Sequence, residues 1–251
     1  MLNIENLHFA YGGNSDVLQG ADLELSQGEV GILLGKNGSG KTTLFKSLLG
    51  LVKPQKGSIA FRGENLLKLN RLQRARRIGY VPQDIQFGAL TVFDSVLMGR
   101  ISYFGIRAGK EDYEAVEKLL ADMGLLELAH RNVEELSGGE RQKIAIARAM
   151  AQEPQMMVFD EPTGNLDIAN EQLIIREAKK LAKEKNIAIL ASLHDLNQAL
   201  ALGDKFFFLK DGIVKYAGGK EVFTPEVIKD IFDADVELLE KDGRLVIVNK
   251  F

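Results

Sequence analysis

The most constraining feature of this chain is the stretch Gly35-Lys36-Asn37-Gly38-Ser39-Gly40-Lys41-Thr42. It fits the pattern G-x-x-x-x-G-K-[ST], in which small residues let backbone N–H groups curl around phosphates. In such a loop Lys41 reaches the β- and γ-phosphate oxygens, and the Thr42 hydroxyl is offered to Mg²⁺. The stretch predicts a nucleotide-binding loop with contacts from Gly35, Asn37, Gly38, Ser39, Gly40, Lys41, Thr42 and Thr43.

The surroundings of this loop match what a phosphate loop requires. An apolar strand is predicted over Val30 to Leu34, and a helix over Lys41 to Leu49 that ends at Gly50. Further buried strands are predicted at Ile78 to Val81, Met156 to Phe159 and Ile187 to Leu193, each ending beside a polar residue. Alternation of such strands with helical patterns predicts an α/β fold with a largely parallel sheet. The loop alone leaves kinases, GTPases and other NTPases open.

Helical and hairpin patterns fill the rest of the chain. Between Gln83 and Pro154 the pattern is helical, with apolar residues at helical spacing up to Met123 and a stop at Gly124. Hairpin turns are predicted at Asp211-Gly212 and Asp242-Gly243. Thr224-Pro225 predicts the start of a short helix, with a capping threonine followed by proline at the first helical position.

Two motifs narrow the class of nucleotide-binding protein. Met156 to Glu161 is an apolar strand that ends in two acids, Asp160 and Glu161; the alternative is a strand end with two solvated acids. Leu136-Ser137-Gly138-Gly139-Glu140-Arg141-Gln142 contains a capping box, in which Ser137 caps a helix and Glu140 is its third residue. Helix capping alone explains those residues, but the same helix start offers N–H groups and a positive dipole end to a phosphate.

Together these motifs resemble those of ATP-binding cassette (ABC) ATPases, and the resemblance runs from about Leu2 to Tyr216. It implies a P-loop NTPase core with an antiparallel β portion and an inserted helical subdomain at about 86–155. The corresponding domain is a single ABC ATPase domain over 1–220, followed by a short helix and hairpin extension over 221–251. It also implies ATP and Mg²⁺ as ligands, and ATP hydrolysis by attack of water on the γ-phosphate.

The resemblance assigns roles to individual residues. Asp160 holds Mg²⁺, Glu161 polarises the attacking water, and Ser137, Gly138, Gly139 and Glu140 hold the γ-phosphate of ATP bound to a second copy in a head-to-tail dimer. Gln83 matches the glutamine that contacts Mg²⁺ and water, and His194 the histidine that touches the γ-phosphate. Tyr11 matches the aromatic residue that stacks on adenine, and Asp167 an aspartate in the loop after the acids. Taken alone, Tyr11 is more often a packing residue and His194 a structural one.

Composition and charge restrict the location and partners of the chain. It has 32 basic and 35 acidic residues and a net charge of −3, which gives no reason to expect nucleic acid. No apolar run approaches the roughly 20 residues of a membrane helix, and no signal peptide is evident, so we expect a cytoplasmic protein. Arg71, Arg74, Arg76 and Arg77 are most simply a solvated helix face, with contact to a permease or membrane surface as the alternative.

Among ABC ATPases, the chain resembles importer subunits for iron chelates, haem and cobalamin. The segments that carry this resemblance are Val96 to Arg100, His194 to Ala199 and Val222 to Glu226. It implies a transmembrane permease as partner, docked at about Gln83 to Arg107, and indirectly an extracytoplasmic substrate-binding protein. The chain would then be peripheral on the cytoplasmic face of the membrane. The alternatives are an ABC ATPase for another cargo and a soluble ABC ATPase of translation or DNA repair.

Overall fold

The fold was analysed in a computed structural model that describes residues 1–12, 16–83, 86–164 and 166–250. Its contacts divide the chain into two compact units. One, called here the phosphate-loop unit, comprises Met1–Leu69 and the chain from Ala178 onward; the other, the helical unit, comprises Asn70–Glu177. Helix α6, Ile168–Lys185, begins in the helical unit and ends in the phosphate-loop unit.

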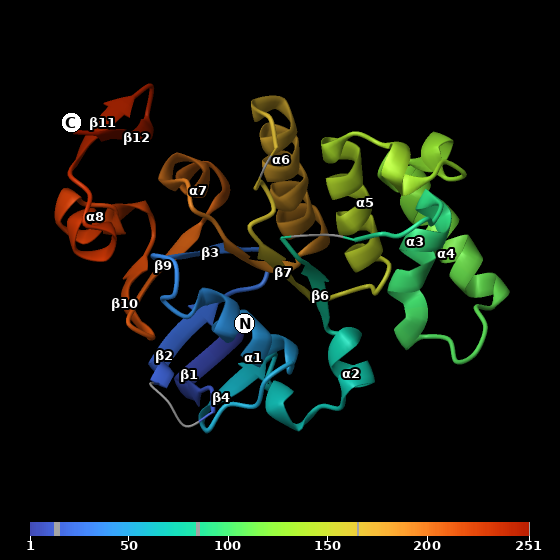
Figure 1. The fold of residues 1–251 in the computed structure, drawn as a ribbon, viewed down its shortest axis with the longest axis horizontal. Helices are drawn as coiled ribbons and strands as arrows, with labels where there is room; N and C mark the ends of the chain where they lie inside the picture. Colours follow the sequence, from blue (N-terminus) through green and yellow to red (C-terminus); the bar gives the residue numbers. More distant parts are fainter. Residues whose placement is uncertain (13–15, 84–85, 165, 251) are drawn as a thin grey trace. The chain divides into compact units, whose positions relative to one another are not determined.

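Two sheets form the phosphate-loop unit (Figure 1). The first is antiparallel, with the order β2-β1-β4-β5, and its strands are β1 Leu2–Ala10, β2 Asp16–Leu25, β4 Lys56–Phe61 and β5 Glu64–Asn65. The second has the order β10-β9-β3-β8, with β3 Val30–Leu34, β8 Ala188–Ser192, β9 Lys205–Lys210 and β10 Ile213–Gly218. Strand β3 is parallel to both β8 and β9, and β10 is antiparallel to β9.

The second sheet is the core of this unit. All five residues of β3 are buried, as are all five of β8, and Phe206 to Phe208 are buried on β9. Strands that are apolar on both faces are typical of parallel sheets covered on two sides. The predicted strand over Val30 to Leu34 is confirmed, and the one predicted over Ile187 to Leu193 is one residue shorter at each end.

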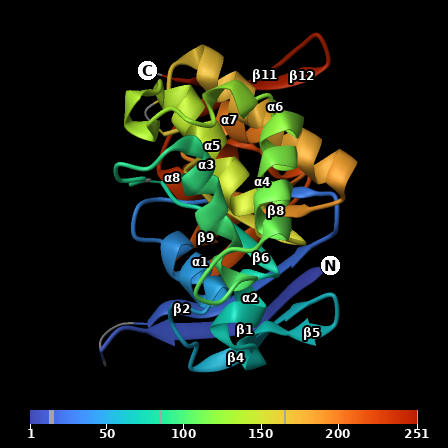
Figure 2. The ribbon, with the colours of Figure 1, turned by 90° about the vertical axis from the view of Figure 1, so that its right-hand side faces the viewer.

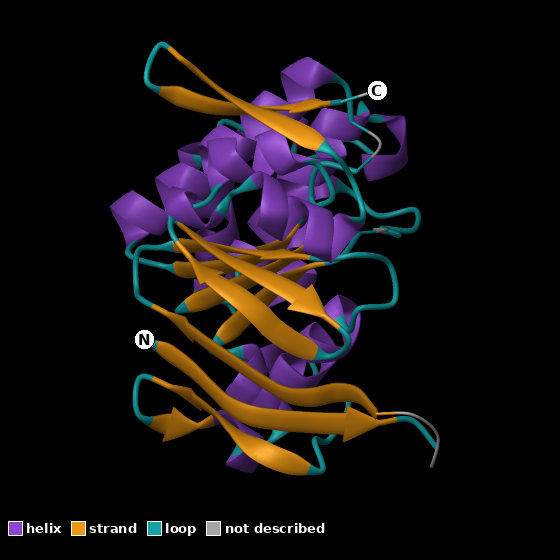
Figure 3. Ribbon diagram, turned by 90° about the vertical axis from the view of Figure 1, so that its left-hand side faces the viewer, coloured by secondary structure: helices purple, strands orange, loops and turns teal. Residues whose placement is uncertain are grey.

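The helices of this unit, apart from the end of α6, are short. They are α1 Lys41–Leu49, the single turn η1 Leu66–Lys68, α7 Leu196–Leu202, the turn η5 Lys220–Val222 and α8 Pro225–Phe232. Helix α8 begins as predicted, with Thr224 accepting a hydrogen bond from the Val227 amide and proline at the first position. Strands β11 Val236–Lys241 and β12 Arg244–Asn249 then form the predicted hairpin, a separate two-stranded ribbon in Figure 3.

The helical unit contains two parallel strands, β6 Ile78–Val81 and β7 Met156–Asp160. Its helices are α2 Arg71–Ala75, α3 Val92–Leu97, α4 Lys110–Asp122 and α5 Gly138–Met150, with the turns η2 Met98–Ser102, η3 Leu126–Leu128 and η4 Val133–Glu135. Helices α3, α4 and α5 contact one another, as Figure 2 shows. In the described part of the chain, no helix has the length and apolar character needed to cross a membrane.

The interpretation of the arginine cluster as a solvated face is wrong for two of its members. Arg74 is 8% exposed. The Arg76 guanidinium donates to the Ser102 carbonyl at 2.9 and 2.5 Å and lies over the Tyr103 ring. The charge pattern does not show these partners, because Ser102 lies 26 residues after Arg76 in the chain. Arg76, the C-cap of α2, therefore joins this helix to the end of η2.

Candidate functional site

The phosphate loop connects the end of β3 to the start of α1, as its sequence predicts. Gly38 and Gly40 have φ angles of 81° and 110°, in the region that side chains disfavour. At Gly40 a Cβ would also lie 2.9 Å from the Val17 carbonyl oxygen. Gly40 is the N-cap of α1, and no side chain caps that helix. The first amides of α1 therefore remain available to an anion from outside.

Two side chains in this loop fit a phosphate ligand. Lys41 is buried, and its Nζ donates to the carbonyl oxygens of Gly35 at 2.6 Å and Lys36 at 3.1 Å, so its ammonium lies across the loop. The Ser39 Oγ is also buried, and within the described residues it has no hydrogen-bond partner. A buried hydroxyl without a partner costs free energy unless a ligand completes it. The loop is thus suited to a polyanion.

The same edge of this sheet carries a second predicted residue. Because β3 and β8 are parallel, with Leu33 opposite Ser192, their carboxyl ends meet at one edge. The phosphate loop follows β3, and the exposed His194 follows β8 by two residues. Two other predicted residues of this unit are exposed. Tyr11 is 48% exposed and packs edge-on against Phe9, with ring centroids 4.7 Å apart. Thr42, the last residue of the phosphate-loop pattern, is exposed at the start of α1.

In the helical unit, β6 and β7 bring the other predicted catalytic residues together. Val81 lies opposite Phe159 in the parallel pair, so the residues that follow both strands meet at one edge. There the Gln83 Nε2 donates to the Glu161 Oε2 at 2.7 Å. Glu161 has a φ angle of 51°, an uncommon conformation for a glutamate and one that tends to occur at functional sites. The structure therefore holds the Glu161 carboxylate in one place from two sides.

Asp160, the other acid, is buried at the end of β7. Tyr80 lies on the neighbouring strand, β6. Burial, and secondarily the Asp160 carboxylate, raise the pKa of Tyr80 to about 12. Tyr80 is consequently neutral over the physiological range.

The predicted capping box is present at the start of α5. The Ser137 amide and hydroxyl donate to the Glu140 carboxylate at 2.9 and 2.7 Å, and the Glu140 amide donates back to the Ser137 Oγ at 3.3 Å. The hydrogen bonds from Ser137 lower the pKa of Glu140. Ser137 and Gly138 are exposed, so this helix start is open to a ligand. Capping and anion binding are compatible here because the cap uses only some of the first amides.

Asn170 supports the same helix start and was not predicted. A Cβ on Gly139 would lie 1.8 Å from the Asn170 Oδ1, so a larger residue there would displace the Asn170 side chain. The Asn170 amide and side chain donate to the Asp167 carboxylate at 2.8 and 3.0 Å. Asp167 therefore fixes Asn170 in the first turn of α6. Gly139 was predicted only as a ligand residue, and its neighbour Asn170 lies 31 residues further on, at a position with no motif of its own.

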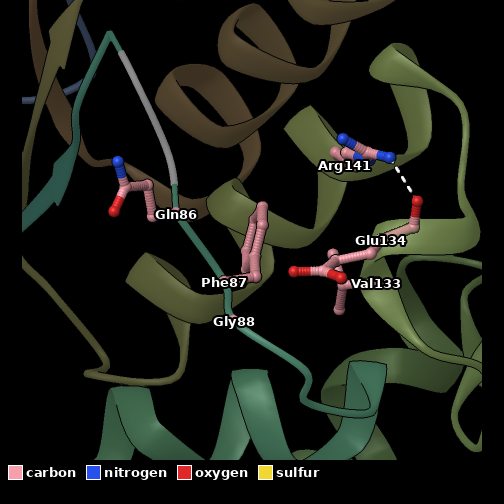
Figure 4. A pocket seen from close by; sticks show the side chains of 6 residues that line it. All are labelled: Gln86, Phe87, Gly88, Val133, Glu134 and Arg141. Atoms are coloured by element: carbon pink, nitrogen blue, oxygen red, sulfur yellow. Dashed lines mark hydrogen bonds between the residues drawn. The ribbon is translucent and has the colours of Figure 1, made fainter.

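A cavity of about 330 Å³ lies between α5 and the segment that follows Gln83 (Figure 4). It is lined by Gln86, Phe87, Gly88, Val133, Glu134 and Arg141. The Arg141 guanidinium donates to the Leu136 carbonyl at 3.0 Å and to the Glu134 carbonyl, which fixes the loop before the capping box. The predicted docking segment from Gln83 to Arg107 includes two residues, 84 and 85, that lie outside the described ranges.

Two residues of the predicted importer motif have packing roles. A Cβ on Gly99 would lie 2.1 Å from the Arg148 carbonyl oxygen. Arg100 is buried and donates to Asp112 at 2.8 Å, to Glu153 at 2.8 Å and to the Ala151 carbonyl at 3.1 Å. These contacts join η2 to α4 and to the end of α5. Gly99 and Arg100 are therefore explained by the fold of the helical unit.

These features define an ATPase of the ABC class, and comparison with known proteins agrees. A family model described as ABC transporter matches residues 18–164, more than half of the chain, so the chain belongs to the ABC transporter family. It is 40% identical to an uncharacterized ABC transporter ATP-binding protein of Methanocaldococcus jannaschii, over 99% of this chain and 97% of that protein. It is thus an ATP-binding, ATP-hydrolysing subunit with a P-loop NTPase core and a helical insertion.

Two importer subunits are also similar. A phosphonates import ATP-binding protein of Wolinella succinogenes is 34% identical, over 92% of this chain and 88% of that protein. An iron(3+)-hydroxamate import ATP-binding protein of Bacillus subtilis is 32% identical, over 95% and 90%. Both relatives are named as import subunits, but for different cargoes.

Two solved structures resemble the fold. One is an inward-facing ABC transporter provisionally classed as metal-chelate type, with a TM-score of 0.86 and 30% identity over 100% of this chain and 97% of that chain. The other is an ATP-binding cassette in a dimeric, post-hydrolysis state bound to ADP and Pi. Its TM-score is 0.74, with 29% identity over 87% and 98%.

Proposed function

We propose that this chain powers an import permease, and that Glu161 is the base of its ATPase reaction. The observation that carries the proposal is the 2.7 Å hydrogen bond from Gln83 to Glu161. It places a carboxylate at the end of a buried strand, held by an amide and by an unusual backbone conformation. A general base must be positioned before its basicity is useful.

The phosphate loop supplies binding in this proposal. The open amides at the start of α1 and the Lys41 ammonium bind the phosphates. The Ser39 hydroxyl forms a hydrogen bond with a phosphate oxygen, and Tyr11 stacks on adenine. Thr42, Asp160 and Gln83 are the expected Mg²⁺ ligands, a hydroxyl, a carboxylate and an amide that suit this hard cation. Bound Mg²⁺ neutralises charge on the β- and γ-phosphate oxygens.

The remaining groups act on the γ-phosphate. Glu161 orients the attacking water and accepts its proton, while Gln83 keeps the carboxylate in position. His194 donates to the γ-phosphate as charge develops on it. No covalent intermediate is needed, because in-line attack by a positioned water suffices for this reaction.

We further propose that ATP binding joins two copies head to tail. The support is the start of α5, where Gly138 and Gly139, next to the Ser137 cap, present amides and a positive dipole end. In the dimer these residues would bind the γ-phosphate of ATP held by the other copy. The solved dimeric cassette with ADP and Pi shows that similar chains pair in this state.

Sedimentation tests the dimer. With saturating ATP, Glu161→Gln should sediment as a dimer, because unhydrolysed nucleotide remains bound. Adding Ser137→Arg should return it to monomer by placing bulk and charge at the helix start, whereas Ala121→Arg, which adds the same bulk and charge at an exposed position of α4 in the same unit, should not. A dimer that tolerates Ser137→Arg would contradict the arrangement.

The permease is proposed to dock on the segment from Gln83 to Arg107. Three large apolar side chains in it are exposed, Met98 at 42%, Ile101 at 54% and Ile106 at 100%. The cavity lined by Phe87 and Arg141 opens in the same region of the helical unit. Exposed large apolar residues in one short segment favour contact with another protein. Such docking would place the chain on the cytoplasmic face of the membrane.

The cargo we propose is a metal chelate delivered by an extracytoplasmic binding protein. The iron-hydroxamate relative and the metal-chelate-type transporter structure support it. The phosphonate relative is the competing indication. The packing roles of Gly99 and Arg100 mean that this motif reports the fold of the helical unit rather than the cargo.

Reconstitution with the permease encoded beside this chain tests both levels of the proposal. In vesicles, a binding protein loaded with an iron chelate should raise ATPase activity, and a phosphonate-loaded one should not. Stimulation by phosphonate alone would overturn the cargo and leave the import role intact. Outward movement of cargo without a binding protein would overturn the import role itself.

A further inference from the structure

The C-terminal hairpin and the loop that carries His194 are joined by an unusual contact. The Asn197 side chain lies in the first turn of α7, three residues after His194. Its Nδ2 donates to the Ile247 carbonyl at 3.0 Å, and its Oδ1 accepts from the Ile247 amide at 2.9 Å. One side-chain amide thus satisfies both backbone groups of a residue 50 positions away.

The geometry of the hairpin explains why Ile247 offers both groups. Ile247 lies opposite Leu238 in the antiparallel pair, and residues in such a pair alternate between bonding across the ladder and facing outward. Because both backbone groups of Ile247 are taken by Asn197, they face away from β11. The Asn197 side chain therefore makes the two hydrogen bonds to β12 that a residue of a neighbouring strand would make. An aspartate could accept from the amide but could not donate to the carbonyl.

The start of α7 depends on such support. Helix α7 has seven residues, too few to be stable alone. Its second half is fixed by the buried Ala199, Leu200 and Leu202, whereas His194, Asp195 and Asn197 are exposed. The contacts that hold this exposed start include the Asp195 cap on the Gln198 amide at 2.8 Å and the Asn197 pair.

The hairpin is itself anchored to the core of the phosphate-loop unit. Ile247 and Val236 are buried, and β11 contacts α8 while β12 contacts α7. The Lys250 amide donates to the Asp235 carbonyl at 2.8 Å, and the Lys229 side chain pairs with the Asp235 carboxylate at 2.6 Å. Phe223, just before α8, packs edge-on against Phe206 of β9. A continuous set of contacts therefore runs from β9 through α8 and the hairpin to Asn197.

We propose that Asn197 is a positioning residue, through which the C-terminal hairpin holds the His194 loop for ATP hydrolysis. This rests on the proposed role of His194 at the γ-phosphate. The extension over 221–251 is then a working part of the ATPase, because it limits where the His194 side chain can lie. Asn197 itself does not touch the nucleotide.

Steady-state kinetics on the full-length chain test the proposal. Asn197→Ala should lower kcat about tenfold and leave KM for ATP within about twofold, as expected when a positioned group is displaced. Asn197→Asp, which keeps only the acceptor, should lie between. Asn249→Ala, an exposed amide on the same strand, is the matched control and should behave as wild type. Wild-type kcat in Asn197→Ala would overturn the proposal.

A double-mutant cycle separates positioning from general destabilisation. In a His194→Ala background, Asn197→Ala should change kcat by less than about twofold, because the group it positions is gone. An equal loss in both backgrounds would overturn the proposal. If His194→Ala alone has wild-type kcat, the proposed role of His194 fails, and with it the catalytic consequence of the contact.

Hydrogen exchange then judges the contact independently of catalysis. Amides of 193–198 should exchange about tenfold faster in Asn197→Ala than in Asn249→Ala, since local opening costs less without the pair. Equal exchange in the two variants would show that the hairpin does not hold this loop.

Discussion

The two units of this ATPase carry their proposed site residues in different ways. In the phosphate-loop unit the proposed ligand groups are mainly backbone amides, shaped by Gly38 and Gly40 within eight consecutive residues. In the helical unit they are side chains held by other side chains, such as Gln83 with Glu161, 78 residues apart. The proposed phosphate contacts are thus encoded locally, whereas the position of the Glu161 carboxylate, the proposed base, depends on the fold.

The largest effect on ATP binding is expected where the backbone is the proposed ligand. Gly40→Ala should weaken ATP binding by about 3 kcal/mol, roughly a hundredfold in Kd, because a left-handed φ and an overlap with the Val17 carbonyl must both be relieved. Calorimetric titration measures it. Gly63→Ala is the matched control, since Gly63 also has a positive φ, 80°, but nothing lies within 4 Å of its Cβ position. Equal losses in the two variants would break the comparison.

A smaller effect is expected for the side-chain pair. Gln83→Ala should lower kcat about tenfold with little change in the Kd for ATP. The Glu161 carboxylate is still present in this variant, but the hydrogen bond that positions it is lost. The exposed neighbouring amide Gln73, in a capping box on α2, provides the control Gln73→Ala. A tenfold loss of ATP affinity in Gln83→Ala would place Gln83 with the binding groups instead.

These two cases show what could be predicted from the sequence. The phosphate loop, α1, the capping box of α5 and both hairpins were predicted correctly, because each is specified by residues adjacent in the chain. Asn170 beside Gly139, Asn197 on Ile247 and the arginines of α2 were missed. Their partners are distant in sequence, and the residues around an asparagine or arginine do not indicate which distant group its side chain contacts. The roles of the site residues stay predictions.

An intermediate effect, on stability rather than on ATP binding, is expected at Gly139. Gly139→Ala should destabilise the fold by about 1–2 kcal/mol, because Asn170 must move and give up its bond to Asp167. Denaturant unfolding measures this loss. Asn170→Ala should remove most of the added cost in the double variant, since the overlapping atoms are then absent. A full penalty in the double variant would show that the overlap is with the backbone.

The smallest effect lies in the phosphate-loop unit, away from the loop. Lys215 at 2.7 Å, Lys210 at 3.1 Å and Tyr216 at 3.2 Å surround the Asp230 carboxylate. The hydrogen bonds from the lysines lower the pKa of Asp230 from 3.8 to about 2. Since its pKa is lower in the folded state, Asp230 stabilises the fold above about pH 4, and this contribution is lost as pH falls towards 2. Asp230→Asn should flatten the pH dependence of unfolding in that window, and Glu240→Gln should not.

The most direct test of the account is single-turnover hydrolysis by Glu161→Gln. The account predicts that this variant binds ATP with a Kd within about twofold of wild type and hydrolyses it about a thousandfold more slowly, as loss of a general base requires. Glu171→Gln, in the first turn of α6, should hydrolyse ATP as wild type does. Hydrolysis by Glu161→Gln at the wild-type rate would contradict the assignment of Glu161, and with it the catalytic role of the helical unit.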